Sequence, residues 1–534
     1  MNANLRRMRR LRKRLARRKR RIERRLDKRD LRGCDRPAMT ATNVRYEVAD
    51  RTVATSYGGI AALHLLAHRL SLPAAINARL ALLKMHLPYH ESDHVLNLAY
   101  NALCGARCLD DLELRRQDEA YLDALGARRV PDPTTAGDFC RRFDESALRA
   151  LQDAFHEVRK KVWAQQPAEF FEQAIVDMDG VVVETGGECK QGIDIAYNKK
   201  WGYHPLIVSL ANTGEVLSLV NRSGNRPSHE GAAAEVDRLL PVLFEGGFQR
   251  VLLRGDTDFS QTRHLDRWDA DGRITFIFGL DVQLSLHVDV DFLPEKAWKP
   301  LERPAKYPLK TQPRRRPENV KQPIVVQRGF KDIRLVNEWV AEMDYRPAAC
   351  QKSYRLVIVR KDLSIEQSGE RLFADYRYFL YLTNDRRSST EEIVFSANDR
   401  CNQENIHAQL TGGVRALYAP VDTLLANWAW MVMTSLAWNL KAWYALLLPA
   451  PPGTGAAAVA QREQKRRVLR MEFRTFVEAF IHVPCQVLRT GRRWVCRFLA
   501  WNRWQDVFIR AVEQLAKPLT NPFPRAPRVA PLRR

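Results

Sequence analysis

The stretch FFEQAIVDMDGVVVET, residues 170–185, marks the point where the hydrophobic pattern changes from helical to strand-like. Asp177 and Asp179 interrupt a run of apolar and β-branched residues that otherwise predicts one strand. Alternate residues of a strand point to the same face, so both carboxylates are expected on one side of it. An ionised carboxylate on a buried strand is costly unless it is paired or binds a metal. The plainer alternative is that the strand ends at Asp177.

The segments that follow alternate between strand and helix. Two strands in hairpin order come first, then a helix, a fourth strand, a second helix and a fifth strand, in the segments GYHPLIVSLA (202–211), EVLSLV (215–220), SHEGAAAEVDRLLPVLF (228–244), QRVLLRGD (249–256), QTRHLDRWDADG (261–272) and RITFIFGL (273–280). Three strands in hairpin order followed by helix and parallel strand are typical of an RNase H-like α/β domain, although other mixed folds contain similar strings.

Changes of composition and period divide the rest of the chain. Apolar spacing is helical before residue 165, strand-rich segments interrupt the α/β alternation, and PAPPGTGAAA (449–458) is typical of a linker. We predict a basic arm lacking stable structure (1–40), a helical domain (41–165), the first part of an α/β RNase H-like catalytic domain (166–281), a β-rich insertion (282–390), the second part of the catalytic domain (391–448), a linker (449–460) and a basic helical region (461–534). The fold class is therefore α/β, flanked by all-helical N-terminal and C-terminal domains.

Positive charge is concentrated at the two ends of this 534-residue chain. The net charge is +24, of which residues 1–30 carry +13 and residues 461–534 carry +12, so the segment between them is nearly neutral. This distribution suits a polyanion such as DNA, and the alternative is a pair of solvated basic tails.

Several classes of protein are disfavoured. Nine cysteines are scattered without a CxxC pair, which favours a reducing cytoplasm over a zinc module or disulfide framework. The charged N-terminus has no apolar core after it, as a signal peptide would. The apolar run 424–448 is interrupted by Asn427, Asn439 and Lys441, so we interpret it as a buried helix pair and expect no membrane contact. Walker and GxGxxG motifs are absent from the sequence.

Two further acids stand where a catalytic site could form. Asp256 ends the apolar run VLLRGD, and open α/β sheets place ligand sites at the carboxyl ends of strands. Asp258 could instead cap the next helix. In ANDRCNQENIHAQL, residues 397–410, helical spacing puts Arg400, Glu404 and His407 on one face. The alternative there is an exposed Arg–Glu pair on a surface helix.

Converging carboxylates suit two-metal phosphoryl transfer. One ion activates the attacking oxygen and the other stabilises the leaving oxygen, with the ions about 3.5–4 Å apart. Mg²⁺ prefers oxygen ligands, so Asp and Glu are the expected residue types. The sequence therefore predicts a site with two Mg²⁺ ions, for which Mn²⁺ is the expected substitute.

These segments together resemble the DDE transposases of bacterial insertion sequences, in the branch with a group 1 DDE domain and a β-strand insertion before the last acid. The resemblance covers about residues 55–510 and rests on DMDGVVVETGG (177–187), YNKKWGYHPLIV (197–208), the Arg-x-Gly-Asn of residues 222–225, the Arg-x-Asp-x-x-Phe of residues 254–259, and the Arg-x-x-x-Glu of residues 400–404. Ala397 and Thr411 depart from the Tyr and Lys of the family's third block.

The resemblance implies an Mg²⁺-dependent cut-and-paste DNA transposase of the bacterial nucleoid. It implies Asp179 as the first acid, with Asp177 close behind, Asp256 as the second acid and Glu404 as the third, all as metal ligands. Arg400 is expected to stabilise phosphate charge. The implied partners are double-stranded DNA, as terminal inverted repeats and target, and a second copy of the chain in a synaptic homodimer. The helical domain is expected to read the DNA ends.

Two other functions remain open at this stage. A catalytically inactive or domesticated DNA-binding protein would keep the fold and the basic ends, although it would normally lose one of the acids. An RNase H-like nuclease would cleave DNA without joining it, and only its products would separate it from a transposase.

Overall fold

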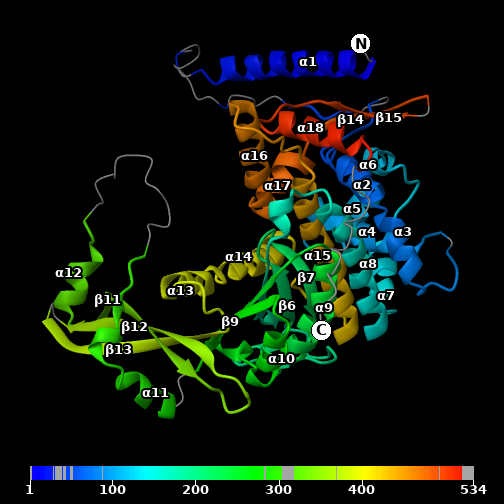
Figure 1. Ribbon diagram of the computed structural model, residues 1–534. Helices are drawn as coiled ribbons and strands as arrows, with labels where there is room; N and C mark the ends of the chain where they lie inside the picture. Colours follow the sequence, from blue (N-terminus) through cyan, green and yellow to red (C-terminus); the bar gives the residue numbers. More distant parts are fainter. Residues whose placement is uncertain are drawn as a thin grey trace, which may run out of the picture.

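The protein is described here by a computed structural model with a helical half and a sheet half, from which a long β arm extends (Figure 1). The structure describes residues 3–27, 29, 39, 44–48, 52–86, 88–281, 284–303, 318–367, 370–491 and 493–519.

A mixed nine-stranded sheet, in the order β10-β11-β12-β13-β9-β8-β2-β6-β7, forms the centre of the described chain. Strand β2 (Ala174–Gly180) pairs antiparallel with β6 (Leu206–Leu210), which pairs antiparallel with β7 (Glu215–Val220). On its other side β2 pairs parallel with β8 (Val251–Gly255), and β8 with β9 (Ile274–Leu280). The expected hairpin order followed by parallel strands is confirmed, and the chain is a mixed α/β protein.

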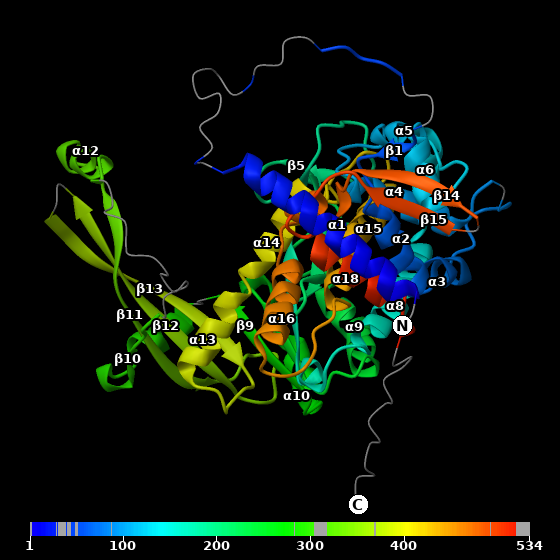
Figure 2. The same ribbon diagram turned by 90° about the horizontal axis from the view of Figure 1, so that it is seen from above.

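The β arm is a continuation of this sheet. It consists of β11 (Asp332–Tyr345), β12 (Tyr354–Gln367) and β13 (Glu370–Thr383), with β10 (Lys299–Pro300) at its edge. Only Leu380–Thr383 of β13 pair with β9, so the rest of the hairpin projects from the body (Figures 1 and 2). Helices α11 (Leu284–Asp291) and α12 (Lys321–Gln327) lie in the chain between β9 and β11.

Helices cover both faces of the central strands. On one face, α9 (Ala232–Glu245) and α10 (Leu265–Ala270) pack apolar side chains against β2, β6, β8 and β9. On the other face, Ile393 and Val394 of α13 (Thr390–Asp399) pack against Leu252 and Ile277. A small sheet lies beside them, formed by β3 (Val183–Glu184), β5 (Trp201–Tyr203) and β4 (Asp194–Ile195).

The helical half surrounds α15 (Leu424–Leu446), whose residues from Ala426 onward are all buried. Around it lie α2 (Ile60–Arg69), α3 (Leu72–Arg79), α4 (Glu91–Leu103), α5 (Asp111–Arg116), α6 (Glu119–Leu125), α7 (Pro133–Cys140), α8 (Glu145–Trp163), α16 (Ala456–Leu469) and α17 (Phe473–Phe476). The expected helix pair is wrong, because residues 424–446 form one continuous helix. No helix in the described residues is long and apolar enough to span a membrane.

Polar residues of α15 bind the outer edge of the sheet. Asn439 accepts a hydrogen bond from the Val216 amide at 2.9 Å and donates one to its carbonyl at 3.0 Å, as a neighbouring strand would. The Glu215 carboxylate accepts hydrogen bonds from the indoles of Trp163 on α8 and Trp443 on α15. The Asn439 contacts pair backbone groups at the outer edge of β7, which would otherwise lack hydrogen-bond partners.

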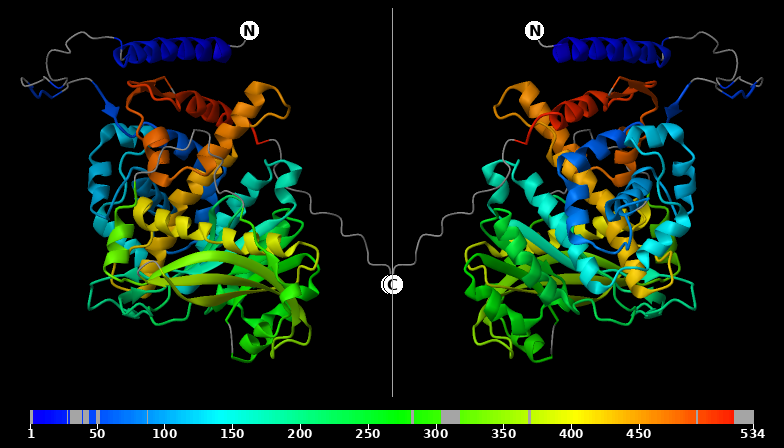
Figure 3. Two further views of the ribbon diagram at one scale, coloured as in Figure 1. Left: turned by 90° about the vertical axis from the view of Figure 1, so that its left-hand side faces the viewer. Right: turned by 90° about the vertical axis from the view of Figure 1, so that its right-hand side faces the viewer.

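The chain ends differ from their sequence expectations. The C-terminal region is not all-helical: before α18 (Gln505–Leu515), β14 (Cys485–Thr490) and β15 (Arg493–Phe498) form a hairpin that pairs with β1 (Ala54–Thr55). Alternating apolar residues around a turn at Gly491, where φ is +60°, explain the hairpin. The basic arm, expected to lack structure, forms α1 (Ala3–Arg25), which lies across α18 and the hairpin (Figures 1 and 3).

Candidate active site

The register between β2 and β8 brings the acids of the two strands together. Asp177 lies opposite Arg254 in the parallel pairing, so two residues further along each chain Asp179 and Asp256 come to the same end of the sheet. This is the carboxyl end of both strands, where open sheets hold their ligands. Asp179 and Asp256 line one cleft of about 520 Å³.

Asp177 is a buried partner of Arg254. The guanidinium donates hydrogen bonds of 2.7 and 2.9 Å to the two carboxylate oxygens, and the side chains are 2% (Asp177) and 4% (Arg254) exposed. Burial raises the pKa of Asp177, against the opposing effect of Arg254. Arg254 also donates to the Ser396 carbonyl at 2.6 Å, which joins β8 to the end of α13. Both oxygens of Asp177 are thus already satisfied within the protein.

Arg400 connects the two remaining aspartates. Its guanidinium lies 3.3 Å from an Asp179 oxygen and 3.8 Å from an Asp256 oxygen. Burial is the largest cause that raises the pKa of Asp179 to about 6, with Arg400 opposing and Asp256 adding to the shift. Burial likewise raises the pKa of Asp256. The site therefore gathers two carboxylates whose charges are compensated by one guanidinium.

His407 lies beside Asp179. Its Nδ1 is 4.0 Å from the Asp179 carboxylate, and burial, assisted by Arg400, lowers the pKa of His407 to about 4. At neutral pH its ring is therefore uncharged. Its neighbour Gln403 donates to the carbonyls of Asp177 and Ile207, so this turn of chain is fixed to β2 and β6.

Glu404 does not form a close group with the two aspartates in this structure. The chain winds tightly between α13 and α14 (Asn402–Ala408), where the Gln403 amide donates a hydrogen bond to the Arg400 carbonyl and the Glu404 amide donates one to the Cys401 carbonyl. The expected shared face is therefore only partly seen: Arg400 and His407 face Asp179, whereas Glu404 is exposed. Among the described residues, Asp179, Asp256 and Glu404 do not form a group with ligand oxygens all within 4.8 Å.

The loop after β7 forms the facing wall of the cleft, and sequence reasoning missed what holds it. The Arg222 guanidinium donates to the carbonyl of His204, and to those of Pro227, Ser228 and Glu230 at 3.1, 3.0 and 2.6 Å. Arg222 is 8% exposed. An arginine in an otherwise apolar strand end was the available signal, as it was for Arg254, because a buried charge requires partners.

Gly180 lets the His204 ring lie against β2. A Cβ atom there would lie 2.6 Å from the His204 imidazole, too close for any other residue without displacement of that ring. The His204 ring is itself oriented by a 2.8 Å contact between its Nδ1 and the Arg226 carbonyl. The cleft is therefore a close fit of β2, β6 and the loop after β7.

Comparison with known proteins identifies one family. Residues 37–519 match the sequence model described as Transposase DDE domain group 1. No curated protein matches the chain. A similar solved structure is titled "Cryo-EM structure of piggyBac transposase synaptic complex with hairpin DNA (SNHP)"; the identity is 12%, the match covers 80% of this chain and 84% of that chain, and the TM-score is 0.37.

Proposed function

We infer the function from the premise that this chain belongs to the transposase family with a group 1 DDE domain, whose sequence model spans most of its length. We propose that it catalyses cut-and-paste transposition of an insertion sequence, by cleavage of phosphodiester bonds and strand transfer. The observation that carries the proposal is the meeting of Asp179 and Asp256 at the carboxyl ends of two parallel strands, on one cleft.

The donor set fits a divalent metal. Asp179 and Asp256 offer carboxylate oxygens to the cleft, which are the ligands that Mg²⁺ and Mn²⁺ prefer. We propose Asp179 rather than Asp177 as the first acid, since Arg254 already occupies both Asp177 oxygens. Glu404 is proposed as the third ligand, because its exposed carboxylate follows Arg400 by four residues on the adjoining helix. Two bound ions would supply activation of the attacking oxygen and stabilisation of the leaving one.

We propose that Arg400 has one role before metal ions bind and another after they bind. Its guanidinium compensates the charge of Asp179 and Asp256, so it competes with a cation for the same oxygens. A guanidinium is also suited to binding phosphate through paired hydrogen bonds. We propose that Arg400 transfers its contacts from the carboxylates to the DNA phosphate when the site is loaded. Gln403 and His407 keep the turn that carries it in place.

The wider assignments are proposals of the same kind. The strand order β7-β6-β2-β8-β9, with three antiparallel and then two parallel strands, supports an RNase H-like catalytic fold. We propose that the segment boundaries given above are domain boundaries, except that α15 and the C-terminal segments belong with the helical half whose core they share. We also propose that the helical half reads the terminal repeats and that two copies synapse two DNA ends. Helix α1 is rich in arginine, and Leu15 on one side of it is buried. We propose that the arginines on its exposed sides contact DNA phosphates.

A DNA-binding relic is the second candidate. It is favoured by two observations: Asp179, Asp256 and Glu404 do not form a close group among the described residues, and the sequence departs from the family pattern at Ala397 and Thr411. Such a protein would bind the same repeats through the basic ends but would leave them intact. Binding and cleavage therefore have to be measured separately.

The test is Mg²⁺-dependent cleavage of labelled DNA that carries the element's own terminal repeats. Asp179→Asn, Asp256→Asn and Glu404→Gln are expected to abolish cleavage and retain DNA binding. Asp399→Asn serves as the matched control, because Asp399 is an exposed acid at the end of α13, next to Arg400. Strong binding without cleavage by the unaltered chain would favour the relic.

A further inference from the structure

A cluster of two histidines and one glutamate lies in the helical half, outside the candidate active site. His86, His90 and Glu91 each offer one ligand atom, and these atoms all lie within 4.8 Å of one another. Among the described residues this is the one group of three or more His, Cys, Asp or Glu side chains with such spacing. The residues come from the loop between α3 and α4 and from the first turn of α4.

The carboxylate of this cluster is fixed in advance. Glu91 is 1% exposed, and its Oε1 accepts hydrogen bonds from the amides of Leu82 and Leu83 at 3.0 and 3.1 Å. The carboxylate is thus held with Oε1 occupied by two amides and Oε2 directed at His86.

The spacing of the cluster suits a shared ion better than a direct ion pair. His86 Nε2 lies 3.4 Å from Glu91 Oε2, longer than the roughly 2.7–2.9 Å of a charge-assisted hydrogen bond. Two ligand atoms each about 2.0–2.1 Å from a tetrahedral ion would be separated by about 3.3–3.4 Å. The His86 and His90 rings are stacked, with centroids 5.0 Å apart, so the imidazole of His90 lies close enough to serve as a further ligand.

We propose that His86, His90 and Glu91 bind one divalent transition-metal ion, with zinc as the best fit. Imidazole nitrogen together with carboxylate oxygen suits Zn²⁺, whereas Mg²⁺ prefers oxygen alone. Three protein ligands leave the fourth position to water. The ion would fasten the loop between α3 and α4 to the start of α4.

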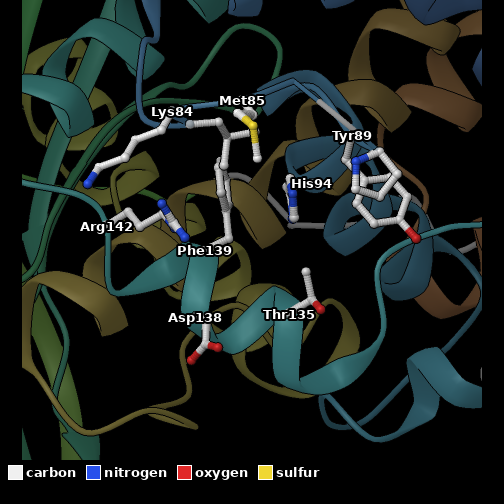
Figure 4. Close-up of a pocket in the computed structure, with 10 residues that line it drawn as sticks. Lys84, Met85, Tyr89, His94, Thr135, Asp138, Phe139 and Arg142 are labelled. Atoms are coloured by element: carbon white, nitrogen blue, oxygen red, sulfur yellow. The ribbon is translucent and has the colours of Figure 1, made fainter.

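The fastened loop forms part of a neighbouring pocket. Lys84, Met85 and Tyr89 from this segment line a cavity of about 410 Å³, and His94 of α4 lies flat against Phe139 on its inner side (Figure 4). The metal ligands flank Tyr89 in the sequence, so an ion there would hold one wall of this pocket. The proposed ion acts on the helical half and does not depend on the proposed catalytic activity.

The test is zinc binding by the full chain, measured by calorimetric titration after chelation and in excess Mg²⁺, which occupies oxygen-only sites. The probe is zinc chloride, and cobalt chloride reports tetrahedral nitrogen and oxygen coordination by its visible absorption. His86→Ala and His90→Ala remove ligands that are exposed, so folding should be preserved. Glu91→Gln keeps an oxygen for the Leu82 and Leu83 amides.

His287→Ala is the matched control, because His287 forms another exposed imidazole–carboxylate contact, at 2.9 Å to Asp291, but has no second imidazole in the pair. We expect one zinc ion per chain and a higher melting temperature with zinc in the unaltered chain and in His287→Ala. The His86→Ala and His90→Ala chains should bind at least about tenfold more weakly and lose the thermal shift. Zinc stoichiometry and cobalt absorption that survive the double substitution, or no zinc binding by the unaltered chain, would overturn the proposal.

Discussion

The buried pair of Asp177 and Arg254 gives the sharpest prediction about the site. Arg254→Ala would leave the Asp177 carboxylate, 2% exposed, without the two hydrogen bonds of 2.7 and 2.9 Å that now satisfy it. Removing one partner of such a buried pair costs about 3–5 kcal/mol, because the remaining charge is left uncompensated. At about 2 °C per kcal/mol for a large cooperative unit, the melting temperature should fall by roughly 6–10 °C.

A double variant distinguishes the cost of an unpaired buried charge from the cost of changed side-chain packing. In Asp177→Leu with Arg254→Met no unpaired charge remains, so this chain should melt above Arg254→Ala despite carrying two changes. Asp179→Asn is the contrasting variant. Burial and the nearby Asp256 raise the pKa of Asp179 to about 6, so neutralising it should not lower the melting temperature. It should nevertheless abolish cleavage.

The measurements are thermal unfolding at neutral pH and DNA cleavage on the same preparations. If Arg254→Ala melts within about 2 °C of the unaltered chain, well under the shift expected for a lost buried pair, then the Asp177–Arg254 contact is not a buried structural pair. Asp177 would then return as a candidate for the first acid. A cleavage-competent Asp179→Asn chain would lead to the same conclusion by an independent route.

Three other perturbations test the site, the stability and the ends of the chain. Arg400→Gln removes the cation that pairs with Asp179 and Asp256, so this variant should bind Mg²⁺ more tightly in a calorimetric titration. It should nevertheless cleave DNA more slowly, and an unchanged Mg²⁺ affinity would contradict competition between Arg400 and Mg²⁺ for the two carboxylates. Burial lowers the pKa of His94 from 6.5 to about 4, so the unfolded chain binds its proton first and stability should be lost as pH falls from about 6.5 to about 4. His407 contributes in the same direction, so His94→Gln should reduce the slope of the chemical-denaturation midpoint against pH without removing it, and an unchanged slope would refute this reasoning. Deletion of residues 1–30, which carry a net +13, should weaken DNA binding and reduce the slope of affinity against salt concentration in an anisotropy titration, whereas an equal slope would show that this segment makes no phosphate contacts.

Local pattern predicted much of the sheet half. The period-two runs around Asp177, around residues 202–220 and before Asp256 correspond to β2, β6, β7 and β8. Strand order could also be anticipated, because a hairpin followed by helical crossovers permits few topologies. Prediction was weaker where packing opposes local pattern: residues 424–446 form one helix despite their polar interruptions, since Asn439 binds the β7 edge.

From the sequence alone it follows that charged residues stand inside buried strands and that Asp256 ends one of them, because burial and strand period can be inferred from neighbouring residues. The family resemblance favoured Asp179 over Asp177, but the physical difference between them comes from the tertiary structure. Their spacing is the same in any strand, but the parallel register with β8 places Arg254 beside the first and Asp256 beside the second. Likewise, helical spacing suggested that Arg400 and Glu404 act together, whereas the tight winding between α13 and α14 turns Arg400 toward the acids and leaves Glu404 exposed. Such choices depend on contacts between residues far apart in the chain, which a local period cannot specify.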